Sequence, residues 1–170
     1  FSSYWEWLKP RENELWITSG RINERWQSGY DDRRRPYIVQ RWPENWIELH
    51  PDAAAERGIE NGDYVQVYSD RIPVQTNTIV GVDGSDFDFA SLLRNGHIEL
   101  TSASITAVAI VTPAEKDNMG YMDFLHTSQP ANALAGRVVD WISGNYNYKM
   151  GVGQVRKKGE RPYKTQFRSM

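Results

Sequence analysis

The sequence has 170 residues, of which 39% are hydrophobic and seven are Trp, enough to bury the core of one globular domain. Its 20 Lys and Arg residues nearly balance 22 Asp and Glu residues, so the net charge of -2 offers no general attraction to nucleic acid or to an anionic membrane. The absence of Cys excludes a disulfide framework, an iron-sulfur cluster held by this segment and a Cys-based nucleophile. No apolar run approaches the roughly 20 residues of a spanning helix and no signal peptide is recognisable, so we expect no membrane insertion.

The first part of the chain predicts two strands and one helix. Residues 14–18 are a β-prone run that ends at Ser19-Gly20, which is typical of a strand leading into a tight turn. Residues 21–41 are basic and aromatic and predict a long loop. Residues 46–49 predict a second strand. Residues 51–58 then begin with Pro, continue with strong helix formers and end with Gly, a pattern that predicts a short helix.

The second part of the chain predicts mostly strands. In chain order we expect a turn at 61–63, a strand at 64–68, a β-like segment at 75–82, one or two helical turns at 87–93, one bent strand or two strands at 97–112, and a last strand at 151–155 before a basic tail. Short strands therefore outnumber helices. The predicted fold class is mainly β, a barrel or sandwich with small inserted helices.

Motifs of the common nucleotide-binding folds and metal sites are missing from the sequence. Gly151-Val152-Gly153 lacks the third glycine and the following helix of a dinucleotide fingerprint, and no phosphate-binding loop is present. His50, His97 and His126 do not stand at zinc-ligand spacing, so structural roles are expected for them. The acidic residues at 83–88 depart from the pattern of a calcium loop. We predict no catalytic residue and no metal ligand in this chain.

Three separated blocks carry a resemblance to a known family. The first is residues 18–29 with Arg33-Arg34 beyond it, the second is residues 48–65, and the third is residues 131–134 followed by Asp140 and residues 147–149. The first block resembles a Thr-Gly-Arg, Trp-His-Thr-Gly and Arg-Arg pattern. The second resembles a helix and hairpin signature, and the third resembles Ala-Asn-x-Leu and Glu-Phe-Lys elements. All three patterns belong to one domain. That domain is the last, carboxy-terminal domain of the molybdopterin oxidoreductases of the dimethyl sulfoxide reductase family. The order and spacing of all three blocks argue against chance agreement.

The resemblance implies a double-psi β-barrel with short inserted helices, formed by residues 1–170 as one molybdopterin dinucleotide-binding domain. It implies molybdopterin guanine dinucleotide as the cofactor, present around molybdenum as a pair in the intact enzyme. We expect the chain to be the carboxy-terminal part of a larger catalytic subunit, because it opens with Phe1 and not with Met. Any iron-sulfur cluster is expected in upstream domains. The fragment alone is expected to position the cofactor and not to catalyse, because the metal performs the reaction.

Ten residues match the family's cofactor-binding positions: Ser19, Gly20, Arg21, Trp26, Gln27, Ser28, Arg33, Asn132, Tyr148 and Lys149. Without a Cβ, Gly20 lets the main chain approach a ligand. Arg21 offers a planar fork to a phosphate or a pterin carbonyl. Gln27 and Asn132 each present a donor and an acceptor, which suits the edge of a heterocycle. Bulky Trp26 and Tyr148 are expected to pack first and contact the cofactor second.

Departures from the family pattern favour one branch. Gln27 stands where formate dehydrogenase-like members have His, and Tyr30-Asp31-Asp32 replaces a small polar stretch. Both features resemble arsenite oxidases, which are periplasmic and pair with a Rieske-type iron-sulfur subunit. Iodate-reducing enzymes share much of the pattern, and nitrate and arsenate reductases are further alternatives. The expected partners are the upstream domains of the same subunit and a Rieske-type subunit, with no nucleic acid.

Two further hypotheses do without molybdenum. Similar barrels also occur as stand-alone enzymes or as recognition modules of chaperone-type ATPases, and fold alone does not fix function. An autoprocessing decarboxylase of this type would need a Gly-Ser pair, and Gly84-Ser85 is the only one. A plain interaction domain would instead use the basic tail, whose charges are Arg156, Lys157, Lys158, Arg161, Lys164 and Arg168.

Overall fold

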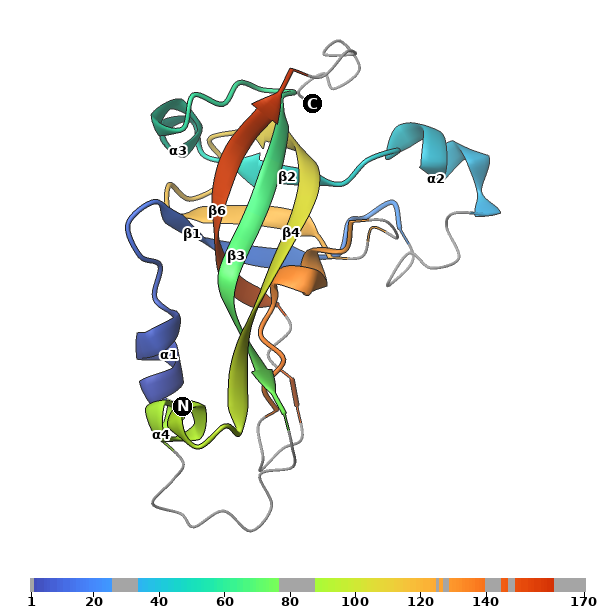
Figure 1. Ribbon diagram of the computed structural model, residues 1–170. Helices are drawn as coiled ribbons and strands as arrows, with labels where there is room; N and C mark the ends of the chain where they lie inside the picture. The colour runs from blue at the N-terminus through green and yellow to red at the C-terminus, as the bar shows by residue number, and fades with distance from the viewer. Residues whose placement is uncertain are drawn as a thin grey trace.

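Six strands form a closed barrel in the computed structural model, which describes residues 2–25, 34–76, 88–124, 126, 129–139, 145–146 and 149–160 (Figure 1). The strands are β1 Glu14–Gly20, β2 Trp46–Leu49, β3 Tyr64–Gln75, β4 Ile98–Val111, β5 Met119–Asp123 and β6 Met150–Gly159. The helices are α1 Ser2–Leu8, α2 Pro36–Arg41, α3 Pro51–Glu56, α4 Phe89–Arg94 and the 3-10 helix η3 Ala131–Leu134. The predicted mainly β class with short helices is confirmed, and the closed barrel agrees with the fold that the resemblance implies.

The strand order brings the predicted site to one rim of the barrel. The order around the barrel is β1-β5-β2-β4-β3-β6, with β1 parallel to β5, β2 parallel to β4 and the other pairs antiparallel. Gly20 pairs with Asp123, and Ile47 pairs with Met122. The carboxyl ends of β1 and β5 therefore lie beside the amino end of β2. Loops that leave these three ends share one rim.

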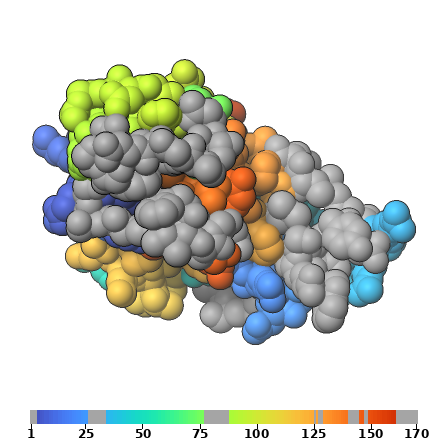
Figure 2. All heavy atoms as spheres, turned by 90° about the horizontal axis from the view of Figure 1, so that it is seen from below, coloured from blue at the N-terminus to red at the C-terminus, as the bar shows by residue number. Residues whose placement is uncertain are grey.

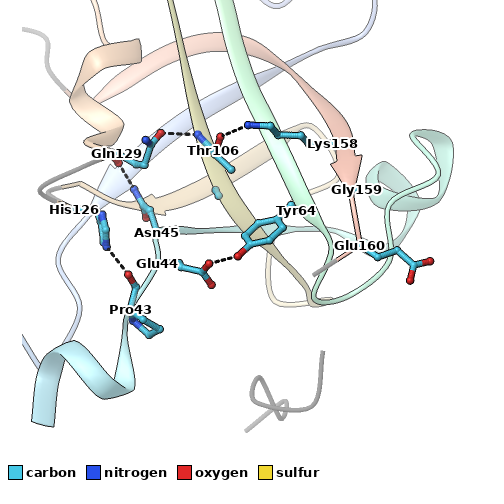
Figure 3. A pocket seen from close by; sticks show the side chains of 11 residues that line it. Pro43, Glu44, Asn45, Tyr64, Thr106, His126, Gln129, Lys158, Gly159 and Glu160 are labelled. Carbon is cyan, nitrogen blue, oxygen red and sulfur yellow. Dashed lines mark hydrogen bonds between the residues drawn. The ribbon is translucent and has the colours of Figure 1, made fainter. Parts of the chain in front are cut away.

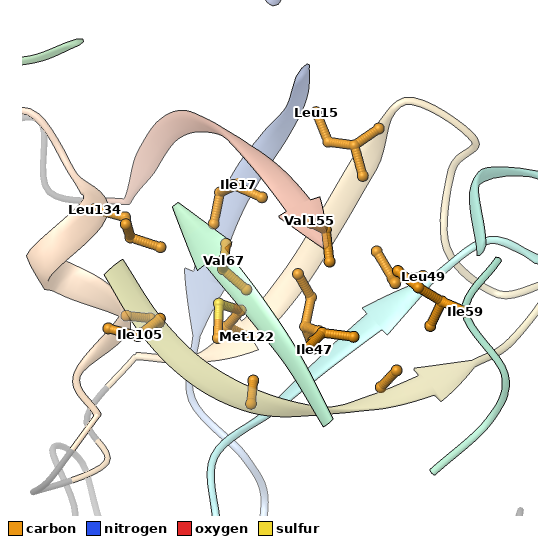
Figure 4. Close-up of a cluster of buried hydrophobic side chains, with 14 of the residues drawn as sticks. Leu15, Ile17, Ile47, Leu49, Ile59, Val67, Ile105, Met122, Leu134 and Val155 are labelled. Carbon is orange, nitrogen blue, oxygen red and sulfur yellow. The ribbon is translucent and has the colours of Figure 1, made fainter. Parts of the chain in front are cut away.

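The core fills the barrel with aliphatic side chains (Figure 4). Along β1 every second residue is buried, as expected for a strand with one face toward the core. Ile47, Val67 and Met122 are fully buried, and burying each such side chain contributes about 1.5–3 kcal/mol. Ala131 and Leu134 of η3 also enter this core, so the short helix closes one end of the barrel. The core thereby fixes the position of the η3 residues.

Local signals explain the predicted helices. The Nδ1 atom of His50 accepts a hydrogen bond from the backbone N–H of Asp52 at 3.3 Å, which caps the start of α3. Gly58 follows the helix with a φ of 62°, a left-handed conformation that favours glycine. Asp88 caps α4 by accepting from the backbone N–H of Ser91 at 3.3 Å. Both predicted helices are confirmed, with α4 at 89–94.

Several predicted boundaries were wrong, and four elements were missed. The segment 97–112, predicted as one bent strand or two strands, is the single strand β4, which confirms the first alternative. In contrast, β3 and β6 extend beyond the strands predicted at 64–68 and 151–155. The missed elements are α1, α2, β5 and η3. Residues 36–41, predicted as part of a loop, form one short helix that carries Pro36 at its start and buries Ile38. A segment this short gives no detectable periodicity.

The turn predicted at 61–63 is confirmed, but it does not join two strands of a hairpin. The turn has a φ of 89° at Gly62, but it leads from α3 into β3, whose partners are β4 and β6. It is held by Asn61, whose Oδ1 accepts from the backbone N–H of Val111 at 3.0 Å. Residues 77–82 of the β-like segment lie outside the described residues. Among the helices that are described, none has the length and apolar character needed to cross a bilayer.

Candidate cofactor-binding site

The carboxyl end of β1 joins the first and third sequence blocks. Ser19 is 8% exposed, and its backbone N–H donates to the carbonyl of Lys149 at 3.1 Å. Its hydroxyl donates to Oδ1 of Asn132 at 3.4 Å. Seen from below, the residues after β1 (blue) and the η3 segment (orange) reach the same face of the molecule (Figure 2). Residues separated by more than 100 positions therefore form one site.

Asn132 is held in place by the core beneath it. Its neighbours Ala131 and Leu134 are buried, whereas Asn132 itself is half-buried. Gly151 of β6 permits this close packing, because a Cβ there would lie 3.1 Å from the carbonyl carbon of Leu134 and closer still to its oxygen. Since Oδ1 of Asn132 accepts from Ser19, the amide nitrogen is the part of this side chain that remains to donate outward.

The need for glycine at position 20 is explained by a neighbouring side chain, without any ligand. A Cβ at this position would lie 2.9 Å from Cε2 of Tyr121 and closer to its hydroxyl, so the missing side chain makes room for the tyrosine. The hydroxyl of Tyr121 donates to the carbonyl of Arg21 at 3.0 Å. Burial first, and then the charges of Glu48 and Asp123, raise the pKa of Tyr121. The hydroxyl therefore stays protonated and anchors the backbone at Arg21.

A buried ion pair supports the segment after Arg21. The guanidinium of Arg25 pairs with the carboxylate of Asp123, and both side chains are less than a tenth exposed. Arg25 also donates to the carbonyl of Trp42 at 3.2 Å. Breaking such a buried pair by removing one partner typically costs about 3–5 kcal/mol. The pair links β5 to the chain between β1 and α2 at the rim.

Cationic groups face solvent beside this polar cluster. Arg21 and Lys149 are exposed, and neither side chain bonds to another described residue. Two cations near a half-buried carboxamide suit a ligand that combines anionic phosphates with a heterocycle edge. Among the described residues no group of acidic, His or Cys side chains is arranged to hold a metal ion. The two cations and the carboxamide therefore offer positive charge and a hydrogen-bond donor of the kind that an anionic, heterocyclic ligand requires.

Half of the predicted site residues can be placed. Ser19, Gly20, Arg21, Asn132 and Lys149 converge at the end of β1, and the other five lie outside the described residues, namely Trp26, Gln27, Ser28, Arg33 and Tyr148. The sequence analysis missed Tyr121, Arg25 and Asp123. Arg25 and Asp123 have opposite charges, but they are far apart in the sequence, which gave no reason to predict an ion pair between them. The sequence around Tyr121 gave no signal of its contact with the backbone of Arg21.

The chain is similar to known proteins over nearly its whole length. Residues 15–82 match the family described as the molydopterin dinucleotide binding domain, a range that begins in β1 and spans β2 and β3. The chain is 43% identical over 169 residues to the iodate reductase subunit IdrA of Pseudomonas sp. (strain SCT), and 44% identical over 172 residues to that of Denitromonas iodatirespirans. These alignments cover 98% and 100% of this chain.

The chain belongs to the molybdopterin dinucleotide-binding domains of the dimethyl sulfoxide reductase family. A weaker similarity, 39% identity over 59 residues, links this molybdopterin-binding domain to the arsenite oxidase subunit AioA of Herminiimonas arsenicoxydans and covers 35% of the chain and 7% of that protein. Among solved structures, acetylene hydratase from Pelobacter acetylenicus matches with a TM-score of 0.50 and 14% sequence identity. The match covers 86% of this chain and 18% of the acetylene hydratase chain, and it shows a shared fold. The chain spans 19% of the length of the iodate reductase subunits.

The residues at the end of β1 fit the family's cofactor, molybdopterin guanine dinucleotide. This cofactor has a diphosphate and two heterocycles, a pterin and a guanine. Arg21 and Lys149 would supply positive charge to the diphosphate, and the amide of Asn132 would supply a donor to a heterocycle carbonyl. The donor set at the rim therefore matches the chemistry of the cofactor.

Proposed function

We propose that this chain is one domain of a larger catalytic subunit, where it holds molybdopterin guanine dinucleotide for an oxyanion-converting molybdenum oxidoreductase. The observation that carries the proposal is the meeting of Ser19, Asn132 and Lys149 at one barrel rim. We further propose contacts from the five predicted residues outside the described part of the chain. When bound, the cofactor supplies two-electron oxygen-atom transfer at molybdenum.

In this proposal the residues of this chain bind and orient the cofactor, and they take no part in the chemical reaction. Arg21 and Lys149 attract the phosphates, and Ser19 fixes the carboxamide of Asn132 so that its amide nitrogen points in one direction. Tyr121 holds the backbone at Arg21 by a hydrogen bond of 3.0 Å. Groups already held in place lose little conformational freedom when a ligand binds. The rim therefore acts as a preorganised support for the cofactor.

The substrate we propose is iodate, with arsenite as the second candidate. Similarity to the subunits named iodate reductase extends over nearly the whole chain, whereas similarity to the arsenite oxidase subunit covers 35% of it. This difference favours the iodate branch over the arsenite oxidase branch predicted from Gln27 and residues 30–32. We also propose, by likeness to arsenite oxidases, a periplasmic location and a Rieske-type partner subunit.

The cofactor role is tested in the full-length protein that contains this chain. Purified wild type is expected to contain molybdenum and to release guanosine monophosphate on acid hydrolysis. Arg21→Ala and Asn132→Ala are expected to lower both contents, by at least about tenfold in the double variant, because each removes one or more charge-assisted or directed hydrogen bonds. Lys116→Ala is the control, since this exposed lysine follows β4 away from the rim. A wild type without either component contradicts the proposal.

The substrate is tested separately with the same preparation. Iodate reduction and arsenite oxidation are measured side by side with artificial electron carriers. Turnover of iodate alone supports the iodate assignment, and turnover of arsenite alone replaces it with the arsenite oxidase assignment. Turnover of neither, in protein that contains the cofactor, rejects both substrates and leaves the cofactor role intact.

A further inference from the structure

Helix α2 projects from the barrel and exposes apolar side chains (Figure 1). Tyr37 is 63% exposed and Val39 is 42% exposed. Among the six residues of this helix, all of them described, Ile38 alone is buried. Isolated helices shorter than about 12 residues are marginal in water, so a short helix normally depends on packing. Most of the packing that would stabilise α2 is therefore absent from this domain.

The carboxyl end of α2 is nevertheless held in a fixed direction. Oε2 of Glu24 accepts hydrogen bonds from Nε of Arg41 and from Nε1 of Trp42, each at 2.6 Å. The ring of Trp42 lies 5.8 Å from the ring of Trp46 at the start of β2. Burial raises the pKa of Glu24, but the hydrogen bonds from Trp42 and Arg41 outweigh it and lower this pKa, so the carboxylate stays charged. The helix is thus oriented by contacts at its end, while its apolar side chains face solvent.

A pocket of about 520 Å³ opens where the chain passes from α2 into β2 (Figure 3). Pro43, two residues after α2, forms part of its wall. The ammonium of Lys158 donates to the hydroxyl of Thr106 at 3.1 Å, and Oε1 of Gln129 accepts from the backbone N–H of Thr106 at 2.7 Å. These polar groups of the lining are already held in place. A partner that covers α2 therefore meets a projecting helix and a preformed hollow next to each other.

The exposed residues at α2 combine an aromatic ring with positive charge. Arg34 and Arg35 stand immediately before the helix, and both are exposed. Tyr and Arg are the residue types that are enriched at protein interfaces and among their energetically important contacts. Two guanidinium groups beside Tyr37 and Val39 suit a partner surface that is apolar at its centre and carries carboxylates at its edge.

The size of this surface favours a partner in the same polypeptide. A six-residue helix is about 9 Å long, whereas separate proteins that form a stable complex bury about 800 Å² on each partner. A small surface is sufficient when the partner is tethered, because tethering raises its effective concentration. The chain spans 19% of the length of the iodate reductase subunits, so in those relatives most of the polypeptide lies outside the matched region.

We propose that α2 and the pocket beside it form the docking surface for another domain of the same catalytic subunit. The inference rests on the proposed function, in which this chain is one domain of a larger subunit. The docking patch on the other domain would have an apolar centre that covers Tyr37 and Val39, and carboxylates that face Arg34 and Arg35. Because Glu24 holds the end of α2 and lies three residues after Arg21, docking would also fix the segment that leads from the β1 rim.

The test measures backbone hydrogen exchange of residues 36–42 in the full-length catalytic subunit, purified as a monomer without a second subunit. A six-residue helix that nothing covers exchanges at nearly the rate of an unfolded chain, because its hydrogen bonds are exposed. We expect exchange at least about a hundredfold slower than that in the wild type. Such protection would show that another part of the same polypeptide covers the helix.

Variants of Tyr37 connect the protection to the exposed side chains. Tyr37→Ser is expected to speed exchange in residues 36–42 at least about tenfold, a loss typical of an interface anchor. Tyr37→Phe keeps the ring and should stay within about threefold of wild type. Leu100→Ser is the control for general destabilisation, because Leu100 of β4 is similarly exposed, at 46%, and lies outside α2 and the pocket. It should leave exchange in α2 unchanged.

Unprotected exchange of α2 in wild type, or an unchanged rate in Tyr37→Ser, would overturn the inference. Protection that arises only in a dimer, or only when a second subunit is bound, would overturn it as well and assign the surface to that partner. The mass of the purified protein is measured first, since a protein of the same length as this chain would contradict the larger subunit itself. Molybdenum and guanosine monophosphate in a wild type with unprotected α2 would leave the cofactor role intact.

Discussion

The side-chain amide of Asn45 donates to the carbonyl of Gln129 at 2.7 Å, across 84 residues of sequence. The same nitrogen donates to the carbonyl of Asp123 at 3.3 Å, and the Oδ1 atom accepts from the backbone N–H of Trp46 at 2.8 Å. Asn45 thus joins both ends of the connection that leads from β5 toward η3. This buried side chain thereby holds the backbone at Gln129, three residues before Asn132.

Replacing Asn45 is expected to loosen that connection. Asn45→Leu keeps a similar volume but leaves buried backbone groups without partners, at about 1–3 kcal/mol each. We expect a loss of about 2–4 kcal/mol in the free energy of unfolding, measured by urea denaturation, and a lower molybdenum content in the full-length protein. Asn61→Leu is the control, because its bond to the backbone of Val111 is exposed and should cost about 1 kcal/mol. Equal losses in the two variants would contradict the role given to Asn45.

The sequence predicts the elements whose signals are local. Pro51 and Gly58 mark α3, and a β-prone run before Ser19-Gly20 marks β1, because neighbours in the chain decide these structures. The site is only partly predictable. The family pattern identifies Ser19 and Asn132, whereas Asn45 and Tyr121 act through partners that only the folded barrel brings close. β5 was missed because Gly120 and Asp123 are poor strand formers that tertiary packing overrides.

Glu14 and Arg71 form a second buried pair, which attaches α1 to the barrel. Their side chains are 5% and 2% exposed, and Nη2 of Arg71 lies 2.6 Å from Oε2 of Glu14. Arg71 also donates to the carbonyls of Trp7 at 2.8 Å and Lys9 at 2.7 Å, near the end of α1. Glu14→Gln is expected to cost about 3–5 kcal/mol of unfolding free energy, because it leaves a buried guanidinium without its counter-charge.

Glu6→Gln is the matched control for this pair. Glu6 and Lys9 also form an ion pair near α1, at 2.7 Å, but both side chains are more than half exposed. Exposed pairs contribute about 0–1 kcal/mol, so this variant should unfold at nearly the wild-type urea concentration. Similar losses in Glu14→Gln and Glu6→Gln would show that burial of the Arg71 pair has no special importance.

The same pair predicts a pH dependence of stability. Burial raises the pKa of Glu14, but hydrogen bonds from Arg71 and from the backbone N–H of Arg11, with the charge of Arg71, outweigh it and lower the pKa below its ordinary value. The carboxylate is then more acidic in the folded than in the unfolded state. Its contribution is complete above the unfolded-state pKa and is lost as the pH falls through the folded-state pKa. The difference in urea stability between wild type and Glu14→Gln should therefore shrink as the pH falls below 4.5, the ordinary pKa of this carboxyl, and a constant difference between them would refute this account.

The contact between Gly151 and Leu134 gives a prediction that separates the position of η3 from general stability. Gly151→Ala would place a methyl group against the carbonyl of Leu134, and because both partners are backbone, η3 must shift away from the barrel. Overpacking of this kind costs about 1–3 kcal/mol. Since η3 carries Asn132, we expect a fall in the molybdenum content of the full-length protein beyond what the lost stability explains. Gly159→Ala is the control from the same strand, where a Cβ would meet nothing within 4 Å. If both variants kept the wild-type molybdenum content, the packing of η3 against β6 would not position the cofactor.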